Sequence, residues 1–130
     1  MHEYSLVRNL LDQVEAHARA QGATAVRRVT VGMGELAGVD PGLFATAFEM
    51  FRTAGPYRDT ELCIRRVEAR WVCGGCGSRI PRGEVLRCAS CGTPARLAAG
   101  DELILERIEL EVPDAQTLRA GRTTPAPLGR

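Results

Sequence analysis

The segment CGGCGSRIPRGEVLRCASCG (residues 73–92) decides the fold, because it separates a compact cysteine-rich module from the rest of the chain. It holds two Cys-x-x-Cys-Gly motifs, and 11 residues separate Cys76 from Cys88. Two residues between cysteines let both thiolates point at one cation, and the glycine that follows tolerates the positive φ of such a tight turn. Four thiolates complete a tetrahedron, so a structural zinc site is predicted on Cys73, Cys76, Cys88 and Cys91.

Other interpretations of the cysteines remain open at this stage. The separation of the two motifs is shorter than the usual 15–20 residues of paired Cys-x-x-Cys zinc sites. Two disulfides or two redox-active dithiols would fit the same pairs, and a single iron suits four sulfur ligands as well as zinc does. The fifth cysteine, Cys63, is predicted to be a small core residue of a strand.

The flanking segments predict a small α+β domain into which the cysteine module is inserted. Leu6, Leu10 and Val14 have the spacing of one buried helical stripe, and Asp40-Pro41 is a typical helix start. The expected elements are helices over 3–21 and 40–51, and strands near 29–33, 61–69 and 102–112.

These elements predict a three-stranded antiparallel sheet with two helices. Residues 1–69 and 99–112 are assigned to this domain, and residues 70–98 to the zinc-binding module. Residues 113–130 are rich in proline, glycine and arginine and poor in apolar residues, which predicts a flexible C-terminal tail.

Composition excludes most enzyme classes. The 130 residues (14.1 kDa) are 45% hydrophobic and 25% charged with a net charge of +1, as in a soluble globular protein. All 17 basic residues are arginine, so lysine-dependent phosphate loops and Schiff-base chemistry are excluded. We expect no enzymatic activity. The chain shows neither a membrane-length apolar run nor a signal sequence, so a cytoplasmic location is expected.

The glycine-rich turn after the first predicted strand imitates a dinucleotide-binding motif. Gly32, Gly34 and Ala37 match its pattern, but Asp40-Pro41 delays the helix whose N-terminus would have to meet the pyrophosphate. We therefore reject nucleotide binding here and interpret Glu35, within the turn, as a surface or packing residue.

Met1-His2-Glu3 is a candidate nickel site. The α-amine, the amide that follows it and the His2 imidazole can converge on one cation, and a planar set of nitrogen and oxygen donors favours Ni(II) or Cu(II). Glu3 can add an oxygen, and Asp40 can bring a further carboxylate besides capping its helix. An exposed histidine near a chain start needs no metal, however, so these residues alone leave both interpretations open. His17 cannot join the site, because one helix would hold it ~22 Å from His2.

The combination of motifs resembles the HypA/HybF family, nickel-insertion accessory proteins of [NiFe]-hydrogenase maturation. The resemblance covers about residues 1–112 and departs from the family at no metal position. It rests on Met1-His2-Glu3-Tyr4-Ser5-Leu6, Val31-Gly32-Met33-Gly34-Glu35, the helix from Asp40 to Phe51, both cysteine motifs and Gly100-Asp101-Glu102-Leu103.

The resemblance implies a nickel metallochaperone that carries nickel on Met1-His2-Glu3 and zinc on the four paired cysteines. It also implies a GTPase nickel-insertion partner and delivery to a hydrogenase large subunit. The alternative is a zinc-ribbon nucleic-acid-binding or adaptor protein, because the module is rich in arginine (Arg70, Arg79, Arg82, Arg87 and Arg96). Against nucleic acid, Trp71 is the single aromatic residue available nearby for stacking on bases.

Overall fold

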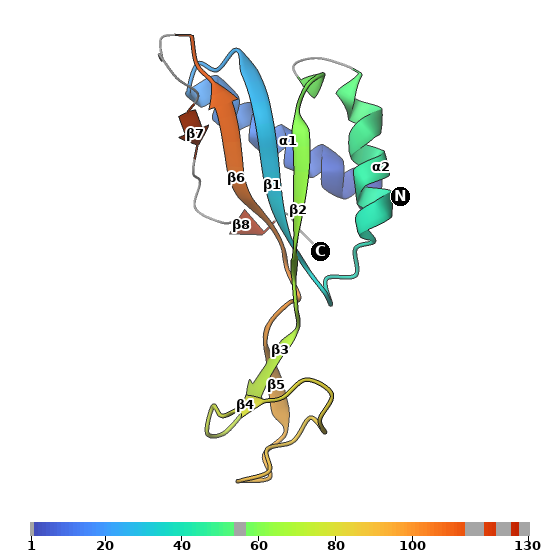
Figure 1. Cartoon of the computed structure of the whole chain (residues 1–130), viewed down its shortest axis with the longest axis vertical. Helices are drawn as coiled ribbons and strands as arrows, with labels where there is room; N and C mark the ends of the chain where they lie inside the picture. The colour runs from blue at the N-terminus through green and yellow to red at the C-terminus, as the bar shows by residue number, and fades with distance from the viewer. Residues whose placement is uncertain (1, 54–56, 114–118, 122–125, 128–130) are drawn as a thin grey trace.

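The computed structural model describes residues 2–53, 57–113, 119–121 and 126–127. Two parts are stacked along the long axis, a helix-covered sheet and a smaller module joined to it by two strands (Figure 1). The elements are α1 (His2–Ala20), β1 (Ala25–Gly34), α2 (Pro41–Arg52), β2 (Glu61–Val67), β3 (Arg70–Cys73), β4 (Arg79–Ile80), β5 (Ala95–Ala99), β6 (Leu103–Glu111), β7 (Arg119–Gly121) and β8 (Ala126–Pro127).

The main sheet is mixed, which corrects the expectation of a fully antiparallel one. Its order is β2-β1-β6-β7, with β8 also paired to β6. β6 runs antiparallel to β1 as expected, whereas β2 runs parallel to β1, with Arg28 opposite Glu61 and Gly34 opposite Val67. The reason is the connection: the chain returns through α2, and a crossover helix brings the next strand back in the same direction.

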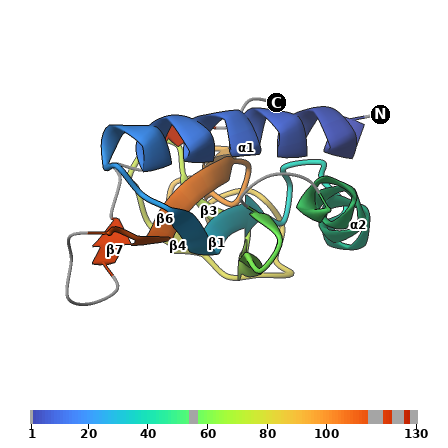
Figure 2. The ribbon, with the colours of Figure 1, turned by 90° about the horizontal axis from the view of Figure 1, so that it is seen from above.

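The core lies between the two helices and one face of this sheet. Figure 2 shows α1 lying across the sheet, with α2 beside it. The predicted α1 stripe of Leu6, Leu10 and Val14 is buried, and so are Phe44 and Phe48 of α2. The sheet contributes Val26, Val29, Val31, Met33, Leu103, Leu105, Ile108 and Leu110.

One irregularity in β6 changes which of its residues face the core. Thr30 pairs with Arg107 while the next residue, Val31, pairs with Leu105, so Glu106 is an extra residue in the strand. Such a bulge shifts the alternation of side chains by one position. Leu105 is therefore buried with Leu103, whereas Ile104 is only half-buried.

Cys63 lies on the outer face of β2 and is exposed, so its predicted role in the core is wrong. Its neighbours Leu62 and Ile64 pack against the core instead, and successive side chains of a strand point to opposite faces.

The segment after β6 contains two short strands that the sequence pattern did not predict. β7 pairs with Ile108 to Leu110, and β8 pairs with Ile104 and Leu105. Most of the tail predicted to be flexible, residues 113–130, falls outside the described residues. Within the described residues, no helix is both long and apolar enough to cross a membrane.

The two parts meet where three backbone segments touch. The amide of Gly34 donates to the carbonyl of Glu102 at 2.8 Å, and the amide of Leu36 donates to that of Gly100 at 2.7 Å. A Cβ at Gly34 would lie 2.4 Å from the carbonyl carbon of Gly100. Gly100 itself has φ +102° and passes so close to Ala69 that its own Cβ would lie 2.5 Å from the Ala69 Cα. Only glycine fits at this crossing.

Candidate metal centres

The four paired cysteines come together at the far end of the smaller module. β3 leads into the first motif, and β5 follows the second. Each motif turns in the same way: the amide of Gly77 donates to the Cys73 carbonyl at 3.1 Å, and the amide of Gly92 donates to the Cys88 carbonyl at 2.9 Å. Both glycines have positive φ, +78° and +73°, as the sequence predicts.

The four sulfur atoms fit one tetrahedral metal ion. All four lie within 4.8 Å of one another, and the Sγ–Sγ distances are 3.3 Å for Cys73–Cys91 and 3.8 Å for Cys76–Cys88. Zinc–sulfur bonds of ~2.3 Å in a tetrahedron place the sulfur atoms ~3.8 Å apart. Cys73 and Cys88 are buried, while Cys76 and Cys91 are exposed.

Backbone amides prepare the buried thiols for a cation. The hydrogen bond from the Cys76 amide, at 3.3 Å, is the largest cause that lowers the pKa of Cys73 to about 6. The amide of Cys91, with that of Ser90, likewise lowers the pKa of Cys88. The thiolate is the form that binds metal, so these amides favour the ligand state.

Two hydroxyl groups beside the exposed cysteines were missed by the sequence interpretation. Ser78 Oγ lies 3.1 Å from Cys76 Sγ, and Thr93 Oγ1 lies 3.2 Å from Cys91 Sγ. A signal was present: both motifs continue as Cys-Gly followed by a hydroxyl residue. Each hydroxyl can hydrogen-bond to a sulfur ligand and so orient it around a metal.

The residues of the candidate nickel site lie at the start of α1. His2 is exposed, and the Glu3 carboxylate reaches the start of α2, where its Oε2 accepts a hydrogen bond from the Asp40 amide at 3.1 Å. Asp40 caps α2, accepting from the Leu43 amide through Oδ1 at 3.0 Å. Glu3 and Asp40 are thus brought together from 37 positions apart. Met1 lies outside the described residues.

Glu35 joins the two parts of the molecule, a role that the sequence interpretation missed. The Arg82 guanidinium donates to both of its carboxylate oxygens, at 2.9 Å between Nη1 and Oε1, and the Ala69 amide donates to Oε1 at 2.8 Å. These hydrogen bonds lower the pKa of Glu35 to about 2, and the hydrogen bond from Arg82 has the largest effect. The partners are 47 positions apart, so no local pattern indicates the pair.

A metal ion is commonly held by three or more histidine, cysteine, aspartate or glutamate side chains. Among the described residues, the four cysteines are the one place where three or more of these side chains lie close enough together. A helix-covered mixed sheet whose first helix presents an exposed histidine, joined to a module that gathers four thiols, defines a small two-part metal-binding protein.

A sequence model of the HypA family, described as "Hydrogenase/urease nickel incorporation, metallochaperone, hypA", matches residues 1–110. The chain belongs to the HypA family.

Individual relatives agree along almost their whole length. The hydrogenase maturation factor HypA of Wolinella succinogenes is 37% identical over 117 residues, covering 88% of this chain and 98% of the relative. That of Aquifex aeolicus is 33% identical over 114 residues, covering 86% and 99%.

Two solved structures share the fold. The solution structure of the Ni metallochaperone HypA from Helicobacter pylori has a TM-score of 0.64 at 29% identity, covering 85% of this chain and 97% of its own. A second solution structure of a HypA protein has a TM-score of 0.70 at 32% identity, covering 85% and 96%.

Proposed function

We propose that this chain is a nickel metallochaperone that binds Ni(II) at its N-terminus and helps to insert it into [NiFe] hydrogenase. The observation that carries the proposal is the position of Glu3, whose carboxylate is anchored on the Asp40 amide one residue from the exposed His2. Glu3 thus holds one oxygen donor at the start of α1, next in the chain to the exposed His2 and two residues from the terminal amine that we propose as a further ligand.

The ligands that we propose are Met1, His2 and Glu3. The α-amine, the adjoining amide nitrogen and the imidazole supply planar donors, a geometry that suits Ni(II), and Glu3 supplies an oxygen or its own amide. Asp40 is a further candidate, because its Oδ1 serves as the helix cap and its second oxygen makes no hydrogen bond within the described residues. A small set of ligands suits a cargo that must be released.

We assign nickel binding to residues 1–69 and 99–112, and structural zinc to Cys73, Cys76, Cys88 and Cys91 within residues 70–98. The tetrahedral spacing of the sulfurs supports zinc. Four protein ligands leave no open position, so this metal holds the module together and is not delivered.

We infer two partners, a GTPase of nickel insertion and the hydrogenase large subunit that receives the metal. The chain itself makes and breaks no covalent bond of a substrate, so we expect no enzymatic turnover. Four unpaired thiols that must stay reduced to hold zinc favour a reducing compartment, which supports action in the cytoplasm.

Calorimetric titration with Ni(II) near neutral pH tests the terminal site. The protein with an unextended Met1 is compared with the same chain bearing two extra N-terminal residues, and zinc content is measured in both. We expect binding that is lost on extension while zinc stays constant. Equal binding in both proteins would move nickel away from the amine, and no binding in either would refute the metallochaperone assignment.

His2→Ala and His17→Ala provide a matched pair for the imidazole. Both histidines are exposed on α1, but only His2 lies at its start. We expect His2→Ala to abolish nickel binding and His17→Ala to leave it unchanged.

A further inference from the structure

One face of the zinc module carries three arginines around a single valine. Val72 in β3 pairs with Arg79 of β4 on one side and with Arg96 of β5 on the other. Side chains directly opposite one another in a sheet share a face, and Arg70, two residues before Val72, shares it too. We call Arg70, Arg79 and Arg96 the arginine face.

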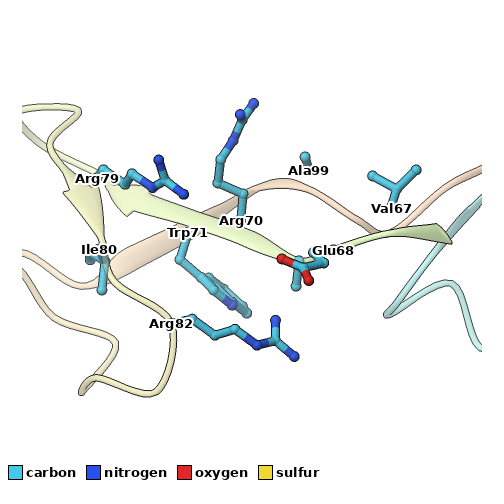
Figure 3. Close-up of a pocket in the computed structure, with 9 residues that line it drawn as sticks. Val67, Glu68, Arg70, Trp71, Arg79, Ile80, Arg82 and Ala99 are labelled. Carbon is cyan, nitrogen blue, oxygen red and sulfur yellow. The ribbon is translucent and has the colours of Figure 1, made fainter.

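The opposite face of the same sheet is apolar. Trp71 pairs with Ile80 and Leu97, so the aromatic ring points away from the arginine face. Figure 3 shows this division directly: Arg70 and Arg79 lie on one side of β3, whereas Trp71 and Arg82 lie on the other.

No acidic side chain of the described residues forms an ion pair with the arginine face. Arg70, Arg79 and Arg96 are exposed, and none forms an ion pair or hydrogen bond with another described residue through its side chain. Two of them, Arg70 and Arg79, line the hollow of about 320 Å³ where this sheet meets the main domain, together with Glu68 and with Arg82, which is paired with Glu35. Arg8, Arg58, Arg66 and Arg87 also form no described ion pair, but they do not share one strand face as these three do. Seven other arginines of the described chain are paired with glutamates: Arg19, Arg27, Arg28, Arg52, Arg65, Arg82 and Arg107.

We infer that the arginine face of the zinc module docks an acidic segment of a partner protein. Guanidinium groups bind carboxylates through paired hydrogen bonds, and Arg79 and Arg96, two strand spacings or ~10 Å apart, can engage separate carboxylates on one segment. Arg70 extends the contact toward the junction of the two parts. This surface uses neither nickel ligand nor zinc ligand, so the inference stands apart from the nickel proposal.

A protein partner fits better than nucleic acid. Single-stranded nucleic acid needs aromatic platforms for its bases, and Trp71 faces the other side. A duplex needs a basic surface that continues along its backbone, but the outer face of the main sheet carries arginines that are already paired, such as Arg28 with Glu61 and Arg65 with Glu106.

Fluorescence anisotropy with a labelled octaglutamate peptide at low salt tests the inference on the full, zinc-loaded chain. The test variant is Arg79→Glu/Arg96→Glu. The matched control is Arg8→Glu/Arg58→Glu, which changes net charge equally at two other exposed arginines without described ion-pair partners. Zinc content and circular dichroism confirm that both variants fold.

We expect the test variant to bind the peptide at least about tenfold more weakly, and the control less than about twofold more weakly. Equal loss in both variants, or no peptide binding by the parent protein, would overturn the inference. A labelled dT12 oligonucleotide is run in parallel. If it binds the arginine face more tightly than octaglutamate, the partner is nucleic acid and the protein assignment is wrong.

Discussion

The backbone amide of Asp40 donates a hydrogen bond to Oε2 of Glu3 at 3.1 Å, which ties the start of α1 to the start of α2. The same aspartate caps α2 through Oδ1. A second contact joins the same two helices: the rings of Tyr4 in α1 and Phe51 in α2 pack with their centroids 4.9 Å apart. The candidate nickel ligand Glu3 therefore has its position set by the tertiary packing of two helices.

Asp40 allows its two roles to be separated. Asparagine keeps an oxygen that can cap the helix, so Asp40→Asn should keep the stability of the parent protein, while Asp40→Ala should cost about 1 kcal/mol. Both should lower nickel affinity by about tenfold through loss of a carboxylate beside the metal. Urea unfolding and nickel calorimetry measure the two effects. If Asp40→Asn binds nickel as tightly as the parent protein does, Asp40 caps α2 and is not a nickel ligand.

Nickel binding should weaken as the pH falls from about 8 to about 6. A terminal amine and an imidazole must both be deprotonated to bind metal, so protons compete with nickel across this range. Calorimetric titrations in buffers of different ionisation enthalpy give both the affinity and the number of protons released. Constant affinity with no proton release would contradict a site made by the terminal amine.

Replacing one cysteine of the sulfur cluster should remove the zinc. Cys73→Ser and Cys88→Ser remove buried ligands and should lower bound zinc from about one ion per chain to nearly none, because zinc binding and folding of the module are coupled. Cys63→Ser is the control, since Cys63 is exposed and lies outside the cluster. Zinc is measured by atomic absorption after gel filtration. Full zinc in either ligand variant would show that a three-cysteine site suffices.

Alanine at Gly34 of β1 should lower the free energy of unfolding much more than alanine at Gly32 of the same strand. At Gly34 a Cβ would meet the backbone of Gly100 at 2.4 Å, and backbone cannot move aside, so we expect a loss of about 1–3 kcal/mol or more. At Gly32 it would meet the end of the Glu106 side chain at 2.3 Å, which can rotate away and give up its exposed pair with Arg65 at a cost below about 1 kcal/mol. Urea unfolding compares them. Similar losses of unfolding free energy in the two variants would mean that the backbone at Gly34 and Gly100 can move apart to admit a Cβ.

The Glu35–Arg82 pair should be insensitive to mild acid. The folded pKa of Glu35 is lowered from 4.5 to about 2, so its stabilising effect is complete above about pH 4.5 and is lost only as the pH falls toward 2. Glu35→Gln keeps an acceptor for the Ala69 amide but removes the charge. Its destabilisation, measured by urea unfolding, should be the same at about pH 7.5 and about pH 5.5. Between about pH 4.5 and about pH 3 the destabilisation should shrink as the carboxylate is protonated in the unfolded state. A destabilisation that stayed constant down to about pH 3 would place the folded pKa of Glu35 near its ordinary value.

Sequence reasoning succeeded where the determining residues are close in the chain. The Cys-x-x-Cys-Gly spacing, the Asp40-Pro41 helix start and the α1 stripe each act over a few positions, and the structure confirms all three geometries. The family, too, was predicted from motifs and is confirmed by the match over residues 1–110.

Sequence reasoning failed where the outcome depends on partners far away. The predicted direction of β2 was wrong because the direction follows from the crossover through α2. The predicted burial of Cys63 was wrong because the face on which it lies depends on the register of β2 within the sheet. The Glu106 bulge was also missed, because only pairing with β1 reveals the extra residue.

The sequence by itself determined the four-thiol cluster and the family, because local spacing fixes turns, caps and ligand sets. Only the tertiary structure decided that Glu3 rests on the Asp40 amide, that Glu35 joins the main domain to Arg82 of the zinc module, and that three arginines share one unpaired face. Each of these depends on strand register or helix packing between segments distant in the chain, and such contacts form only when the core of the whole domain is buried.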